Sequence, residues 1–278
     1  MTLKRILYRS YIRFLEKLVL LYPFKSCFSY NLSIKELEKI DNSPVVDIVV
    51  VTFNNKQIFE HQARLVKKYL SGNYNYIVAD NSSDKSIRKE IQALCVKNDI
   101  SYVSLPPNYL TRSKSHAAAL NWIYYKIICR RRPDIFGFID HDLFPISKVN
   151  IAEKISNQPI YGLLRERSPF WYLFAGLCFF KFNFVEKKKV DFMPRMEKDI
   201  YLDTGGSNWH SLYAFLDINK ITTFVTEKQV TFRKQETAKR HADEIEYFDD
   251  CWLHTINGSY WAKVDNKDDF VNTFLEKY

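Results

Sequence analysis

Alternating apolar and polar segments divide the first half of the chain into short strands and amphipathic helices. Residues 45–51 form an almost unbroken β-branched run, which is typical of a strand buried on both faces. The same pattern continues with helices predicted over 56–70, 84–98 and 115–131 and strands over 76–79, 100–105 and 135–139. Strands that alternate with helices predict an α/β fold, with a mixed, mostly parallel central sheet flanked by helices.

After Pro145 the pattern loosens. Strands are predicted over 160–164, 172–182, 221–225 and 229–232, and a helix over 207–216. We therefore expect one domain over residues 44–278, with a regular half over 44–145 and a less regular half over 146–278.

Residues 1–43 form a basic amphipathic stretch, in which leucines and isoleucines are interspersed with lysines and arginines. We expect a helical appendage that either lies on an anionic membrane surface or packs on the main domain with its basic face in water. The sequence contains no run of 18 apolar residues, so no transmembrane helix is expected.

The formal net charge of +9 suits phosphate-rich partners, namely nucleotides, anionic lipids or nucleic acid, without choosing among them. The five cysteines are scattered and show no C-x-x-C spacing, which indicates reduced thiols. These features predict a cytoplasmic protein, which is peripheral on the inner face of the membrane if the appendage binds lipid.

Two carboxylates, Asp140 and Asp142, flank His141 directly after the predicted strand over 135–139. Ligands of open α/β sheets bind at the carboxyl ends of strands. Two carboxylates there repel each other unless a cation lies between them, and Mn²⁺ or Mg²⁺ prefers such oxygen ligands. An isolated D-x-D also marks solvated turns, but its place at a strand end favours a metal site.

Polar residues also close the first two strands. Thr52 and Asn54 follow the first, and Asp80 begins the Asp-Asn-Ser-Ser segment after the second. Taken alone, these residues are better explained by turns and helix caps than by a binding site.

Together, residues 50–54, 78–83 and 138–142 resemble the GT-A fold glycosyltransferases, most closely those of the family 2 type. Residues 112–121 are similar to the start of that family's donor-side helix. The similarity covers residues 44–145 in the family's order and weakens beyond them. It implies a GT-A, Rossmann-like fold, a nucleotide-sugar donor and a divalent cation, Mn²⁺ or Mg²⁺.

The resemblance also implies roles for individual residues. Asp80 would contact the base or ribose, with Thr52 and Asn54 nearby, and Asp140 would lie between the ribose and the metal. Asp142 would ligate the metal directly. The donor phosphates would lie near Arg112, Lys114 and His116, where side-chain cations and a helix N-terminus both favour an anion.

The acceptor side is expected in the second half. Gly176, in an apolar strand, would let a sugar approach the backbone, and Trp171 would stack on it; a plain core strand is the alternative. In the segment Leu-Asp-Thr-Gly-Gly, Asp203 would be the general base, with Gly205 and Gly206 beside the acceptor. The family's usual Glu-Asp pair is absent there, because Leu202 precedes Asp203.

Several alternatives remain open for these assignments. Asp199 is a rival base. His254 would be a further metal ligand or phosphate contact, with His210 and His241 as weaker candidates; the aromatic rings of Trp209 and Trp261 could also stack on sugar but are more often core.

The predicted activity is transfer of a sugar, from a UDP-sugar in the first instance, to a glycan or lipid-linked glycan with inversion at the anomeric carbon. GDP- and dTDP-sugar donors and retention of configuration stay open as alternatives, because no sequence feature fixes them. A sugar-phosphate nucleotidyltransferase is the first alternative, although no glycine follows the first strand at residues 54–57. A nucleic-acid-binding protein is the second, but its basic surface would rest on the short cluster at 130–132, so no nucleic-acid partner is expected. The intact acidic pair argues against a non-catalytic sugar-binding relative.

Overall fold

The computed structural model describes residues 40, 45–105, 110, 112–231, 244–256 and 267–278. The predicted appendage over 1–43, apart from residue 40, lies outside this range, as do His241 and Trp261.

A six-stranded sheet in the order β3-β2-β1-β4-β7-β6 forms the centre of the molecule. Strand β1 runs parallel to β2 and β4, and β2 runs parallel to β3. Strand β7 runs antiparallel to both β4 and β6. The bounds are β1 Val46–Thr52, β2 Tyr74–Asp80, β3 Ser101–Ser104, β4 Ile135–Asp140, β6 Ile160–Arg167 and β7 Phe170–Lys181. The predicted mixed, mostly parallel sheet is therefore confirmed, and both halves of the chain contribute strands to it.

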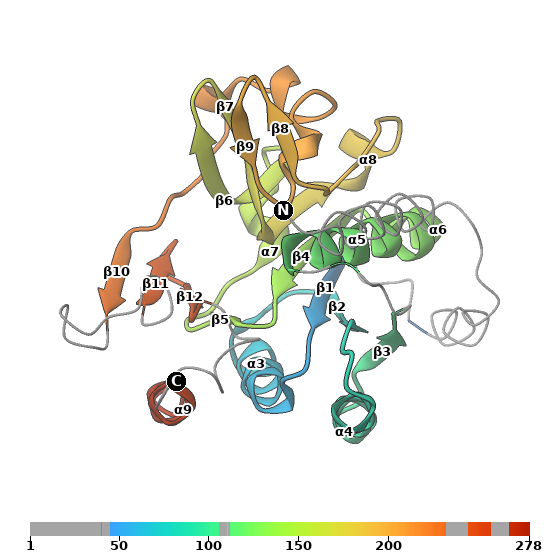
Figure 1. Cartoon of the computed structure of the whole chain (residues 1–278), viewed down its shortest axis with the longest axis vertical. Helices are drawn as coiled ribbons and strands as arrows, with labels where there is room; N and C mark the ends of the chain where they lie inside the picture. Colours follow the sequence, from blue (N-terminus) through green and yellow to red (C-terminus); the bar gives the residue numbers. More distant parts are fainter. Residues whose placement is uncertain (1–39, 41–44, 106–109, 111, 232–243, 257–266) are drawn as a thin grey trace, which may run out of the picture.

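Helices cover both faces of this sheet (Figure 1). Ile48 and Val50 of β1 pack in the same buried cluster as α3 and α4, whereas Val49 and Val51 pack with α5. This division explains the apolar run in β1, because each face of the strand meets a helical layer. The helices are α3 Lys56–Tyr69, α4 Lys85–Lys97 and α5 Arg112–Ile123, which continues through the π-helical η3 Tyr124–Ile128 into α6 Cys129–Arg131.

A second, antiparallel sheet has the order β10-β11-β12-β5. Helix α9 (Lys267–Leu275) packs with it and with α3 through Val271, Leu275, Ile58 and Leu65. Its strands are β5 Leu143–Pro145, β10 Lys228–Thr231, β11 Glu244–Phe248 and β12 Trp252–His254. Because β5 follows β4 after two residues, this sheet begins at the carboxyl edge of the central one.

Short elements complete the described chain. Strands β8 (Arg195–Glu197) and β9 (Ile200–Leu202) form a separate hairpin. The others are α7 Ile151–Lys154, α8 Phe182–Val185 and the 3₁₀ turns η4 Gly206–Asn208, η5 Tyr213–Phe215 and η6 Ile218–Lys220.

Two predicted elements in the second half were wrong. The segment 207–216 forms the separate turns η4 and η5 instead of one helix, and tertiary contacts replace helical ones: the Asn208 side chain accepts from the Asp191 backbone N–H at 2.8 Å. The segment 221–225 is not a strand, because Gln158 bonds to both the N–H and the carbonyl of Thr222, at 2.8 and 3.0 Å.

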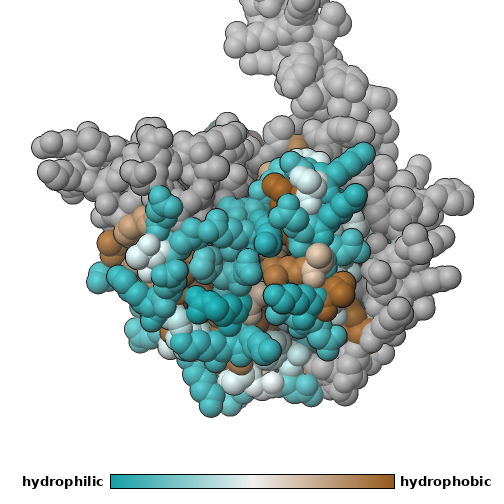
Figure 2. Space-filling view, turned by 90° about the horizontal axis from the view of Figure 1, so that it is seen from below, coloured by the Kyte–Doolittle hydropathy of each residue, from teal (hydrophilic) through white to brown (hydrophobic). Residues whose placement is uncertain are grey.

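The face that carries α3, α4 and α9 is mainly hydrophilic, and its hydrophobic residues form small patches (Figure 2). Among the described residues, no helix combines the length and the apolar character needed to cross a bilayer.

Strands β4 and β7 approach closely at Gly137, which lies directly opposite Phe179. A Cβ atom at Gly137 would lie 2.0 Å from Cδ1 of the Phe179 ring, and that ring is fully buried. We expect Gly137→Ala to lower the free energy of unfolding by about 1–3 kcal/mol, because the ring must move within a packed core. Urea denaturation measures this, and Phe179→Leu in the Gly137→Ala background should recover part of the loss. Unchanged stability of the single variant would contradict the close packing.

A candidate metal and donor site

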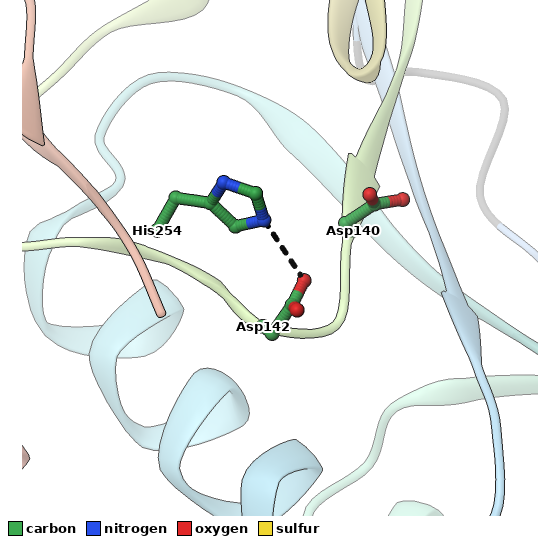
Figure 3. Close-up of side chains that lie close together, drawn as sticks. All are labelled: Asp140, Asp142 and His254. Atoms are coloured by element: carbon green, nitrogen blue, oxygen red, sulfur yellow. Dashed lines mark ion pairs between the residues drawn. The ribbon is translucent and has the colours of Figure 1, made fainter. Parts of the chain in front are cut away.

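The acidic turn lies where the two sheets meet. Asp140 is the last residue of β4, and Asp142 precedes the first residue of β5. Together with His254 they form a cluster in which one ligand atom from each residue lies within 4.8 Å of the others. Figure 3 shows the His254 ring with one nitrogen turned toward Asp142, and Asp140 at the end of the strand that leads into the turn.

His254 reaches the acidic turn through strand pairing. Strand β12 runs antiparallel to β5, with His254 opposite Leu143. The N–H of Thr255 donates to the carbonyl of Asp142 at 2.9 Å, and its hydroxyl donates to the same oxygen at 3.2 Å. This pairing leaves His254 Nε2 at 3.4 Å from Asp142 Oδ1.

A buried glutamine on α3 holds the backbone of the acidic turn. Nε2 of Gln62 donates to the carbonyls of Asp140 and Leu143, both at 2.6 Å. The Tyr76 hydroxyl donates to Gln62 Oε1 at 2.9 Å and so orients the amide. Sequence reasoning missed Gln62, yet a signal was present: a polar residue stands on the apolar stripe of a predicted helix, between Phe59 and Val66.

Gly176 on β7 makes room for the Asp140 side chain. A Cβ atom at Gly176 would lie 2.2 Å from Asp140 Oδ2. The glycine was predicted for its closeness to a bound sugar, but the structure shows a direct reason for it within the protein itself.

The charges at the site depend strongly on one another. Burial by itself lowers the pKa of His254, but the carboxylates of Asp142 and Glu246 outweigh it and raise the pKa to about 9. Burial raises the pKa of Asp140, and the like charge of Asp142 adds to this, although His116 opposes it. His116 Nε2 lies 3.2 Å from Asp140 Oδ1. Each carboxylate of the turn therefore lies close to a histidine.

The donor set fits a divalent cation. Two carboxylates and an imidazole nitrogen are ligands that Mn²⁺ accepts, and Mg²⁺ accepts the carboxylates. The side chains of Asp142 and His254 are 7% and 8% exposed, so the two groups are largely shielded from water. A cation between the two carboxylates would relieve their mutual repulsion.

The loops after β1 and β2 are tied to each other by side chains. Asn54 Oδ1 accepts from the N–H groups of Ser83 and Asp84, each at 3.0 Å. Asp80 is fully buried, and its two oxygens accept from the Ser82 N–H at 2.8 Å and the Tyr102 hydroxyl at 2.9 Å. Asn54 and Asp80 therefore shape this edge through internal contacts.

Thr52, at the end of β1, is also fully buried. Its Oγ1 has no hydrogen-bond partner among the described residues.

The start of α5 holds three of the predicted phosphate-binding residues. Arg112 is the first residue of the helix. Its side chain lies outside the described part of the chain, so its contact with a phosphate stays a prediction. Lys114 and His116 are half-buried, and His116 contacts Asp140. The Thr204 hydroxyl donates to the Ser113 carbonyl at 3.3 Å, which joins the helix start to the segment of Asp203.

Asp203 is exposed and lies directly after β9, next to β7. Its N–H donates to the Tyr172 hydroxyl at 2.9 Å, and one carboxylate oxygen accepts from the Thr204 N–H at 2.8 Å. Gly205 has a φ of 94° and donates its N–H to the Phe192 carbonyl at 2.8 Å. A Cβ atom there would lie 3.7 Å from the Cβ of Ala175, the neighbour of Gly176. The segment of Asp203 thus packs on β7 at Tyr172 and Ala175, and Ala175 directly precedes Gly176 in the chain.

Other predicted residues lie elsewhere. Asp199 is in the turn of the β8–β9 hairpin, with a φ of 65°. Gly206 packs tightly on Leu202, since a Cβ atom at Gly206 would lie 2.3 Å from the Leu202 Cβ.

Aromatic and histidine alternatives in the second half are engaged in other contacts. Trp171 is 9% exposed and packs against Trp209 and Tyr213, so it is a core residue and we leave it out of the site. His210 is exposed and pairs with Glu197 at 3.0 Å.

The sequence matches no family model, and no curated protein sequence matches it. Solved glycosyltransferase structures match part of the chain. The mannosyltransferase PcManGT from Pyrobaculum calidifontis, in complex with GDP-Man and Mn²⁺, has 16% identity and a TM-score of 0.38 over 62% of this chain and 57% of that one. TarS from S. aureus has 13% identity and a TM-score of 0.37 over 53% of this chain and 30% of that one. WbbM, a bifunctional glycosyltransferase, has 14% identity and a TM-score of 0.35 over 50% of this chain and 32% of that one. Each match spans less than two thirds of the solved chain.

The close approach of Gly176 to Asp140 leads to a prediction. We expect Gly176→Ala to weaken Mn²⁺ binding by about tenfold or more, because the new methyl group displaces one carboxylate of the cluster. Isothermal titration calorimetry with Mn²⁺ measures the affinity, and circular dichroism checks the fold. Wild-type affinity in a folded variant would show that Asp140 does not need its present position.

Proposed function

We propose that this chain is a metal-dependent glycosyltransferase that moves a sugar from a nucleotide-sugar donor to a glycan or lipid-linked glycan. One observation carries the proposal: Asp140, Asp142 and His254 converge at the carboxyl edge of the parallel strands. This edge is where α/β sheets bind nucleotides, and a carboxylate-held cation is suited to a diphosphate. The mixed sheet agrees with the GT-A arrangement that the sequence resembles.

The donor diphosphate would lie between the acidic turn and the start of α5. Lys114 brings a cationic group and His116 an imidazole to this place, and the first N–H groups of the helix favour an anion. The contact of His116 with Asp140 links the helix start directly to the metal cluster. The nucleoside would extend toward the ends of β1 and β2, beside Thr52, and uridine is the nucleoside we propose first.

Asp203 would act as the general base of a single displacement. Its carboxylate takes the proton of the acceptor hydroxyl, and the hydroxyl oxygen bonds to the anomeric carbon from the face opposite the diphosphate. The bond between that carbon and the diphosphate oxygen breaks, so the nucleoside diphosphate leaves and the configuration inverts. When bound, the cation supplies charge neutralisation for the departing diphosphate. The exposure of Asp203 favours this role over one as a buried turn residue.

Asp142 provides the test of the metal site. We expect Mn²⁺ together with UDP, at about 100 times the dissociation constant, to raise the melting temperature of the wild-type protein by roughly 5–10 °C. Asp142→Asn should abolish this shift and sugar transfer, because a direct metal ligand is lost. Differential scanning fluorimetry with UDP, GDP, dTDP and CMP measures the shift and identifies the nucleotide. The control is Asp217→Asn, at an exposed cap of a 3₁₀ turn.

A wild-type protein that responds to none of the four nucleotides, and instead binds nucleic acid with salt-sensitive affinity, would overturn the proposal in favour of a binding protein.

Asp203→Asn separates catalysis from donor binding. We expect kcat to fall by about 10²–10⁴-fold, because the amide cannot take the hydroxyl proton, while the Mn²⁺-UDP melting shift remains. Release of nucleoside diphosphate during transfer to an acceptor found by screening glycan and lipid-linked fractions measures the rate. Asp199→Asn, in the β8–β9 turn, is the matched control. Loss of activity in the Asp199 variant alone would assign the base to the hairpin turn instead.

A further inference from the structure

Glu246 lies behind the His254 ring, on the side away from the acidic turn. The two residues are opposite each other on β11 and β12. His254 Nδ1 lies 3.1 Å from Glu246 Oε2, whereas Nε2 lies 3.4 Å from Asp142 Oδ1. The ring is therefore held between two carboxylates, one of which belongs to the metal cluster.

Side chains from β6 and from the segment before β10 hold Glu246 in this place. The Thr226 hydroxyl donates to Glu246 Oε1 at 3.5 Å, and the Arg165 guanidinium of β6 lies 3.8 Å from Oε2. The same guanidinium lies over the Phe174 ring of β7 at 4.8 Å, and that ring is 5.5 Å from the imidazole of His254. The Glu246 side chain is only 12% exposed. Contacts on two sides thus restrict both the carboxylate and the imidazole.

An imidazole binds a metal through one nitrogen, and the hydrogen bond at the other nitrogen decides which one is available. A carboxylate at Nδ1 accepts the Nδ1 proton and leaves the Nε2 lone pair free. We infer that Glu246 is a positioning residue, which fixes His254 so that Nε2 faces the metal site formed with Asp140 and Asp142. This inference rests on the proposed function, and it adds a residue that belongs to none of the recognised motifs.

Glu246 is placed to act through His254 and not as a ligand itself. It contacts Nδ1, on the opposite edge of the ring from Asp142. Among the described residues, the cluster of ligand atoms within 4.8 Å of one another consists of Asp140, Asp142 and His254, without Glu246.

The test uses the full chain and two substitutions of the same residue. Glu246→Ala removes the hydrogen-bond acceptor, and Glu246→Gln keeps an acceptor oxygen but removes the charge. The matched control is Glu244→Gln on the same strand, where the side chain bonds to Gln229 at 2.8 Å. Isothermal titration calorimetry with Mn²⁺ gives the affinity, and circular dichroism confirms that each variant is folded.

We expect Glu246→Ala to weaken Mn²⁺ binding by about 10–100-fold, as is typical for partners of metal-bound histidines. Glu246→Gln should lose less, and Glu244→Gln should bind like the wild type. Proton NMR of the Co²⁺-loaded protein gives a second readout. The Nδ1 proton of a bound histidine appears as a paramagnetically shifted, exchangeable signal, which should exchange slowly with water in the wild type and rapidly in Glu246→Ala.

Three results would overturn the inference, and they distinguish the role of Glu246 from the existence of the metal site. Wild-type affinity and slow Nδ1 exchange in Glu246→Ala would remove the role of Glu246 and keep the metal site. Complete loss of binding in both Glu246 variants, equal to that in Asp142→Asn, would make Glu246 a ligand. A wild-type protein that does not bind Mn²⁺ would remove the metal site and this inference with it.

Discussion

The amide of Gln62 is the contact on which the candidate site depends most. Its two N–H groups bond to backbone carbonyls on both sides of the acidic turn, and so they join the end of β4 to the start of β5. Those carbonyls are at the edge where the central sheet passes into the second sheet, and the bond to the Leu143 carbonyl is buried, so a donor there stabilises the turn. Helix α3 therefore both covers the sheet and sets the direction in which Asp142 points.

The first half of the fold could be predicted because its local and long-range signals agree. Strand β1 follows from its run of β-branched residues. The start of α4 follows from Asp84, whose side chain accepts from the N–H groups of Ser86 and Ile87. The acidic pair could be placed as well, since it directly follows an apolar strand. For these parts, sequence neighbours supply most of the information.

The rest of the site depends on contacts between distant residues. The polar position of Gln62 on an apolar helix face is visible in the sequence, but its partner is not. No local pattern indicates that β12 pairs with β5 or that Glu246 faces His254, because these partners are far away in the chain or in strands paired by tertiary contacts. Trp171 shows the opposite error, in which an aromatic residue suited to a sugar is buried in a cluster of other aromatic rings. Local composition could not distinguish these cases, since burial is decided by tertiary packing.

The pairing that brings His254 to the acidic turn also constrains when the site can form. Thr255 and Asp142, which are hydrogen-bonded there, are 113 residues apart, so the chain must close a long loop before His254 reaches the acidic turn. During synthesis from the N-terminus, β4 and its two carboxylates are made well before β12 exists. Until that strand docks, the acidic turn has neither its histidine nor a covered edge. The proposed metal site is therefore completed late in folding, only after β12 has paired with β5.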